Sequence, residues 1–167
     1  MQTEHEDHDD ILKAARAGDE DEVAAVLSID NRLTRVVDAD GWTPLHLAAH
    51  YDHARVVTTL LANNADVHVR SQNAMKNQPL HAAAAGKATK AARVLLDGGA
   101  DANATQAGGF TPLHSAAQNG NRELVVLLLE RGAKPELAAD DGRTALMLAE
   151  AGGHEDVAGL LRRDRTT

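Results

Sequence analysis

The chain has 167 residues, of which 43% are hydrophobic and 25% are charged, so it is long enough to form one globular domain with a core. Its 25 acidic and 17 basic side chains give a formal net charge of -8, which argues against a nucleic-acid-binding protein because phosphate recognition usually needs a basic surface. The chain contains no cysteine, which excludes disulfides, thiol nucleophiles and cysteine-ligated zinc, and it has no apolar run of the length that predicts a transmembrane helix.

The first 30 residues carry the whole net negative charge, with ten acidic residues against two basic ones. Those from Asp19 to Glu22 lie where a helix is expected to begin, and acidic residues there complement the helix dipole. Met1 to Asp10 contain five acidic residues and no Lys or Arg, the opposite of a secretory or organellar leader. We therefore expect residues 1–7 to form a disordered acidic tail and the protein to be cytoplasmic.

A tetrapeptide recurs along the chain, and its starts are 35, 33 and 33 residues apart. A Thr before a Pro is typical of a helix N-terminus, with the hydroxyl as the N-cap and the Pro at the first helical position. Repetition at such a period indicates a repeat architecture. The four copies are Thr43-Pro44-Leu45-His46, Gln78-Pro79-Leu80-His81, Thr111-Pro112-Leu113-His114 and the divergent Thr144-Ala145-Leu146-Met147.

Each tetrapeptide is followed by alanines, by a second apolar group that ends in a leucine pair, and by a turn. Val and Leu at helical spacing give a second helix one buried face. Gly99 and Gly132, with Asn64 in the same position of an earlier copy, suit the left-handed residue that ends a helix. The polar stretch before the next tetrapeptide is too short for a third helix and fits an extended hairpin.

This pattern resembles the ankyrin repeat, whose signature runs Gly-x-Thr-Pro-Leu-His-x-Ala-Ala and closes with Gly-Ala-Asp-x-Asn. Residues 41–49 and 109–117 match the first part almost completely, and residues 99–103 match the second. Residues 11–23 resemble the helix pair of a leading unit that lacks the hairpin. The resemblance covers nearly the whole chain.

The resemblance implies an all-α repeat solenoid, an ankyrin-type stack of helix-turn-helix units joined by short β-hairpin loops. We expect a single domain over residues 8–163, whose first and last units are caps with a polar outer face. Its five units are expected at about 8–37, 38–70, 71–105, 106–138 and 139–163.

The third unit departs most from the pattern. Lys76 stands where the hairpin glycine belongs, Gln78 replaces the Thr, and residues 69–78 are two residues longer than their counterparts. We expect this hairpin to bulge or protrude.

Sequence patterns for catalysis and metal binding are weak. His46, His50 and His53 are spaced i, i+4 and i+7, and the first two have metalloprotease-like spacing without the catalytic Glu. The glycine pairs are isolated turns and form no phosphate-binding loop. We therefore expect no enzyme activity, no catalytic residue, no cofactor and no metal. The resemblance gives the repeated tetrapeptides a structural role, which falls on Thr43, Pro44, His46, Pro79, His81, Thr111, Pro112 and His114.

In the family, the residues beside the hairpin glycine and those that end the first helix contact partners. All three aromatic residues, Trp42, Tyr51 and Phe110, fall at such positions, and aromatic side chains are favoured in binding hot spots. The alternative is that Trp42 and Phe110 pack across neighbouring hairpins, and the sequence favours neither. Around them, a polar rim of candidate contact residues comprises Asp40, His50, Met75, Lys76, Asn77, Gln118, Asn119, Asp140, Asp141 and Arg143.

The predicted function is a non-catalytic protein–protein interaction module, an adaptor or scaffold that binds a partner protein through its concave hairpin and inner-helix groove. The alternative is a dedicated inhibitor or regulatory partner of one enzyme. We expect a monomer that binds neither nucleic acid nor membrane. The 32 alanines, and Arg outnumbering Lys by 12 to 5, favour a bacterial source.

Overall fold

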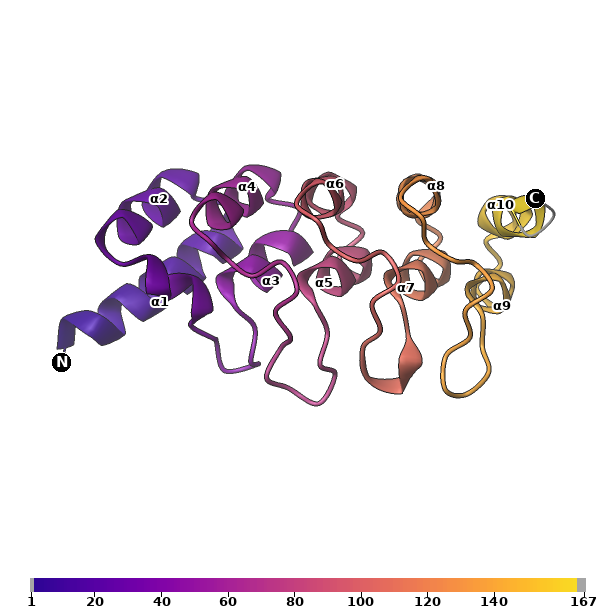
Figure 1. The fold of residues 1–167 in the computed structure, drawn as a ribbon, viewed down its shortest axis with the longest axis horizontal. Helices are drawn as coiled ribbons and strands as arrows, with labels where there is room; N and C mark the ends of the chain where they lie inside the picture. Colours follow the sequence, from indigo (N-terminus) through magenta and orange to yellow (C-terminus); the bar gives the residue numbers. More distant parts are fainter. Residues whose placement is uncertain (1, 165–167) are drawn as a thin grey trace.

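The computed structural model describes residues 2–164, and the side chains of residues 7–163. These residues form five helix pairs in a row, with the first helices in one layer, the second helices in another and the loops on the far side of the first layer (Figure 1). The first helices are α1 (Gln2–Ala17), α3 (Pro44–His50), α5 (Pro79–Ala85), α7 (Pro112–Gln118) and α9 (Ala145–Ala151). The second helices are α2 (Glu20–Ile29), α4 (Ala54–Ala62), α6 (Thr89–Asp97), α8 (Arg122–Glu130) and α10 (Glu155–Asp164), and two 3-10 turns are η1 (Asn31–Arg35) and η2 (Ala107–Gly109).

Each unit packs mainly against the units before and after it, as expected of a solenoid. Helix α3 contacts α1 and α5, and α4 contacts α2 and α6. The core between the layers consists of leucines, valines and many alanines. Small residues let first helices approach closely: a Cβ atom added to Gly86 would overlap the carbonyl oxygen of His50 in the preceding unit. The predicted all-α repeat stack is confirmed.

The histidine of each internal tetrapeptide joins its unit to the next. His46 accepts a hydrogen bond at Nδ1 from the backbone N–H of Thr43 (3.3 Å) and donates from Nε2 to the carbonyl oxygen of Asn77 (2.9 Å). His81 and His114 repeat this arrangement with the carbonyl oxygens of Phe110 (3.3 Å) and Arg143 (3.1 Å), and Nε2 of His81 also lies 3.0 Å from the carbonyl oxygen of Ala104 in its own unit. These hydrogen bonds agree with the structural role that the resemblance implies for the tetrapeptide histidines. In the fifth unit Met147 holds this position and is 52% exposed.

The loops turn back as hairpins but do not form strands. One backbone hydrogen bond closes each loop, for example from the N–H of Asp38 to the carbonyl oxygen of Trp42 (2.9 Å). Within residues 2–164, the one β-bridge joins Ala138 and Thr144. The expected β-hairpins are therefore loops with one closing hydrogen bond and a turn bond inside it, because the chain enters the next helix directly after the closing pair and leaves no room for a ladder.

Backbone hydrogen bonds also link the tips of neighbouring loops. The N–H groups of Gln72, Ala107 and Asp140 donate to carbonyl oxygens of the preceding loop at 2.8, 2.8 and 2.9 Å. In the fourth loop this close contact depends on a glycine: Gly109 has φ +74°, and a Cβ atom there would lie 2.9 Å from the backbone nitrogen of Asp140. The loop tips thus form a continuous, connected edge of the stack.

The loop of the third unit is wider than the others, as expected. Its closing bond joins the N–H of Ser71 to the carbonyl oxygen of Asn77 and encloses five residues, whereas the closing bonds of the other three loops enclose three. Lys76 takes the left-handed conformation of the missing glycine, with φ +50°. Asn77 and Gln78 are buried, and their side-chain oxygens have no hydrogen-bond partner.

The amino-terminal segment differs from the expectation of a disordered tail over residues 1–7. Helix α1 begins at Gln2, so residues 2–7 continue the helix that carries Ile11, and Met1 lies outside the described residues. Acidic residues are favoured in the first turns of a helix because they complement its dipole, so the same composition that suggested a solvated tail is compatible with a helix.

Candidate partner-binding surface

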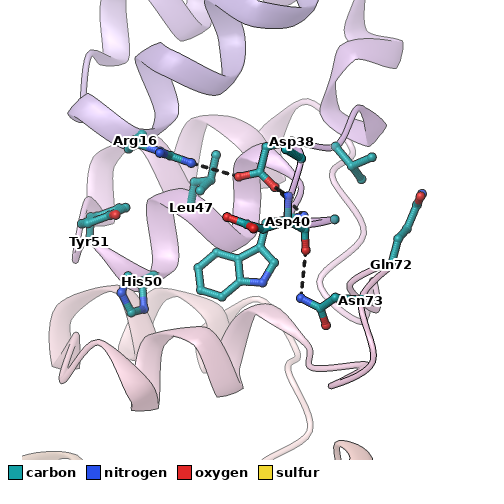
Figure 2. A pocket seen from close by; sticks show the side chains of 12 residues that line it. Arg16, Asp38, Asp40, Leu47, His50, Tyr51, Gln72 and Asn73 are labelled. Atoms are coloured by element: carbon teal, nitrogen blue, oxygen red, sulfur yellow. Dashed lines mark hydrogen bonds and ion pairs between the residues drawn. The ribbon is translucent and has the colours of Figure 1, made fainter.

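We define the loop face as the surface formed by the loop tips together with the last turns of the first helices. A hollow of about 730 Å³ lies on it, between the loops of the second and third units and the ends of α1 and α3. Figure 2 shows Tyr51 and His50 on one side of the hollow and Gln72 and Asn73 on the other, with Asp40 between them. The hollow is lined by Arg16, Val37, Asp38, Ala39, Asp40, Gly41, Trp42, Leu47, His50, Tyr51, Gln72 and Asn73.

Asp38 organises the loop beside the hollow. Its Oδ1 accepts hydrogen bonds from the backbone N–H groups of Asp40 (3.0 Å) and Trp42 (2.9 Å), and its Oδ2 pairs with the Arg16 guanidinium at 2.9 Å. The side chain of Asp38 is only 12% exposed. Sequence reasoning missed both members of this pair. Asp38 could have been recognised as a residue that bonds the backbone of its own turn, but the approach of Arg16 is a long-range contact.

Asp40 has a free carboxylate at the rim. Its backbone carbonyl accepts a hydrogen bond from Nδ2 of Asn73 (2.9 Å), which fixes the position of the loop tip. Asp40 is exposed, and within the described part of the chain its carboxylate makes no ion pair and accepts no hydrogen bond. The hollow therefore has one uncompensated carboxylate, since the Asp38 charge is offset by Arg16.

Aromatic rings line the helix side of the hollow. Trp42 is partly buried against the core, and the His50 ring meets it edge-on at a centroid distance of 5.2 Å. Tyr51 meets the other side of His50 at 5.0 Å and is 48% exposed. Trp42 thus packs against the core and against His50 of its own unit and also lines the hollow, and its contact with a partner stays a prediction.

Phe110 lies in a different environment. The guanidinium of Arg143, from the following loop, lies 5.3 Å from the centroid of the Phe110 ring. Asp141 pairs with the same guanidinium at 2.7 Å, and this hydrogen bonding holds the pKa of the Asp141 carboxyl below its usual value. Phe110 therefore packs across neighbouring loops, as in the second alternative, with its ring covered by a residue of the protein itself.

The other rim candidates divide into exposed and structural residues. Met75 is 49% exposed at the tip of the third loop, and Lys76 beside it is exposed too. Asn77 is only 7% exposed, so its place in a contact rim is wrong: its N–H donates to Oγ of Ser71 and its carbonyl accepts from His46.

The two rim candidates at the end of α7 belong to the junctions between units, whereas Asp140 is exposed in the last loop. Asn119 donates from Nδ2 to the carbonyl oxygen of Ala84 (3.2 Å) in the preceding unit. Gln118 is exposed, but its carbonyl accepts from Nε2 of His154 (3.0 Å).

The histidines beside the hollow do not converge. His46, His50 and His53 hydrogen-bond to the carbonyl oxygens of Asn77, Ala82 and Arg16, respectively, which lie in different elements. Among the residues with described side chains, no group of three or more His, Asp or Glu residues is placed to hold a metal ion. In that same portion, no helix combines the length and apolarity needed to cross a bilayer.

Comparison with known proteins agrees with this architecture. A family model described as ankyrin repeats in three copies matches residues 80–166, and one described as a single ankyrin repeat matches residues 40–72. Oxysterol-binding protein-related protein 1 of Mus musculus is 38% identical over 78 residues, which are 41% of this chain and 8% of that protein, so the chain spans only a small part of this relative. Ankyrin repeats are generally protein–protein interaction modules without enzyme activity. The matched ranges and the stacked helix pairs show that this chain belongs to the ankyrin repeat family.

Proposed function

We propose that the protein binds a partner protein through its loop face, as a non-catalytic adaptor or scaffold in the cytoplasm. The observation that carries this proposal is the hollow on that face, where the half-exposed Tyr51 ring and the unpaired Asp40 carboxylate lie together with Trp42. Aromatic anchors in a recess with polar surroundings are typical of binding hot spots.

The construction of the loop face supports this function. Hydrogen bonds between neighbouring loop tips, from Gln72 to Gly41 and from Ala107 to Met75, fix the loops relative to one another before any partner binds. A surface that is already ordered loses less conformational entropy on binding, which favours affinity.

The hydrogen bonding of the buried histidines favours a binding role over a catalytic one. The buried tetrapeptide histidines use both ring nitrogens in hydrogen bonds to the backbone of their own and the following unit. His114 likewise bonds within its own unit and to the carbonyl oxygen of Arg143. These side chains serve the structure of the stack rather than proton transfer.

Quantitative capture of a partner by the tagged full chain tests the proposal. The double variant Tyr51→Ala, Met75→Ala removes exposed side chains from the loop face, and Ile29→Ala removes one that is 79% exposed at the end of α2, in the layer of second helices. We expect the double variant to reduce capture about tenfold or more while Ile29→Ala leaves it unchanged, with melting temperatures within a few degrees of the parent. Equal capture by the parent and the double variant would contradict the proposal.

An activity assay of the captured partner distinguishes the two roles that the sequence left open, adaptor and inhibitor. If the partner is an enzyme whose activity falls when the purified chain is added, the chain is an inhibitor or regulator. If its activity is unchanged, the adaptor role holds.

A further inference from the structure

We propose that the hollow beside Trp42 receives an arginine side chain of the partner protein, stacked on the indole and paired with the Asp40 carboxylate. This inference rests on the proposed function and names the chemistry that the partner presents. It follows from an interaction that the protein already makes with one of its own arginines further along the same face.

That internal interaction involves Phe110 and Arg143. Phe110 directly precedes the tetrapeptide of the fourth unit, and Arg143 holds the same position in the fifth unit. The Arg143 guanidinium lies over the Phe110 ring at 5.3 Å and pairs with Asp141 at 2.7 Å. The loop face thus already holds a guanidinium that contacts both an aromatic ring and a carboxylate.

The second unit has a ring and a carboxylate, and among residues 7–163 no Arg or Lys side chain lies over the ring. Trp42 holds the position of Phe110, but the carboxylate comes from the same loop as the ring, since Asp40 lies two residues before Trp42, whereas Asp141 belongs to the loop after Phe110. The residue of the following loop that corresponds to Arg143 is Asn77, which is buried and uncharged.

Charge favours a cationic occupant. Arg16 borders the hollow but is paired with Asp38 at 2.9 Å, so Asp40 supplies the excess negative charge among the lining residues. The neighbouring first unit belongs to the segment of 30 residues that carries ten acidic and two basic residues, and this field attracts cations towards the same end of the stack.

The geometry favours arginine over lysine. A guanidinium is planar and weakly hydrated, so it can stack on an indole face while its N–H groups bond a carboxylate. An ammonium group is a compact, strongly hydrated charge that forms such a double contact less well.

Trp42 is the only tryptophan of the chain, so its indole N–H resonance reports on the hollow directly. The probes are the α-acetylated amides of arginine, of citrulline, which has the same shape without the charge, and of lysine, each titrated into the full chain. We expect the arginine probe to shift the Trp42 resonance saturably, with affinity about tenfold higher than that of citrulline and severalfold higher than that of lysine.

Asp40→Asn should weaken binding of the arginine probe about tenfold, because it removes the carboxylate and keeps the shape of the side chain. Asp21→Asn is the matched control: it removes an equal charge from an exposed position on α2, outside the hollow, and should leave the affinity unchanged within twofold. Equal responses to arginine and citrulline, or an unchanged affinity of Asp40→Asn, would overturn the proposal. These results do not depend on partner capture: if the probe fails while Tyr51→Ala, Met75→Ala still reduces capture, the arginine pocket is wrong and the protein-binding function stands.

Discussion

At the scale of single residues, the tetrapeptide histidines act as neutral connectors. The backbone N–H of Gln78 donates to Nδ1 of His81, which places the ring proton on Nε2, where it is donated to the carbonyl oxygen of Ala104 (3.0 Å). A second proton on Nδ1 would face the N–H of Gln78 and break this connection. The two bonds together require the uncharged imidazole.

Acid should therefore destabilise the stack. Burial lowers the pKa of His81 from 6.5 to about 4, and it also lowers the pKa values of His46 and His114. Between these two pH values the unfolded chain binds more protons than the folded chain, so the stabilisation is complete above pH 6.5 and is lost as the pH falls towards 4. His81 alone should lower the free energy of unfolding by about 2 kcal/mol between neutral pH and pH 5.

Urea unfolding at pH 7.5 and pH 5.0 measures this loss. His81→Asn is the control variant: it should be less stable than the parent at pH 7.5 but should lose less stability on going to pH 5.0. Carboxylates act in a lower pH range: hydrogen bonding to Arg32 lowers the pKa of Asp30 from 3.8 to about 2, so the stabilisation by this carboxylate is present above pH 3.8 and is lost as the pH falls towards 2. A parent protein equally stable at both pH values would show that the histidines are not buried as neutral groups.

At the scale of the element, the third unit has two destabilising features, and a residue of the preceding unit compensates for one of them. Its wide loop buries Asn77 and Gln78 with unsatisfied oxygens, and Ala88 at the start of α6 has no side chain to cap the helix. Asp52 of the preceding unit supplies the cap, since its Oδ1 accepts from the N–H of Ala91 at 2.8 Å. Asp52 itself has φ +61°, a conformation that favours glycine.

Restoring the tetrapeptide should stabilise this unit. In the second and fourth units the Thr43 and Thr111 hydroxyls lie 2.9 and 2.8 Å from Nδ1 of the following histidine and donate to it. Gln78→Thr should supply the same bond to His81 and remove a buried oxygen without a partner, for a gain of about 1 kcal/mol and a melting temperature about 2–4 °C higher.

The reverse change in the fourth unit, Thr111→Gln, provides the matched control and should lower the melting temperature by a similar amount. Thermal unfolding followed by circular dichroism measures both. A Gln78→Thr variant no more stable than the parent would mean that the side-chain oxygen of Gln78 is satisfied in solution.

The sequence predicted the elements that recur from unit to unit, but it missed contacts that occur at only one place in the stack. The tetrapeptide fixes where each first helix begins, so α3, α5, α7 and α9 all start directly after its first residue. The Arg16–Asp38 pair and the burial of Asn77 depend on how one unit lies against the next, and no local pattern encodes them. The absence of strands among residues 2–164 was missed for a related reason, because loop length alone does not show how many backbone bonds a loop closes.

At the scale of the whole molecule, the stack presents two different surfaces. The layer of second helices is covered by charged residues and ion pairs such as Arg131–Asp97 (2.6 Å). On the loop face, the tips are tied together by backbone bonds, and the hollow, the exposed aromatic ring of Tyr51 and the exposed Met75 lie towards the acidic end of the chain. This asymmetry supports the proposal that a partner binds at the loops around Asp40 and Met75.

Hydrogen exchange of the chain, alone and in complex with its captured partner, tests binding through the loop face most directly. We predict that the partner slows exchange in residues 38–42 and 72–76 and at the end of α3, and that exchange in α4, α6 and α8 changes little. Protection confined to those second helices, with unchanged exchange in the loops, would contradict binding through the loop face.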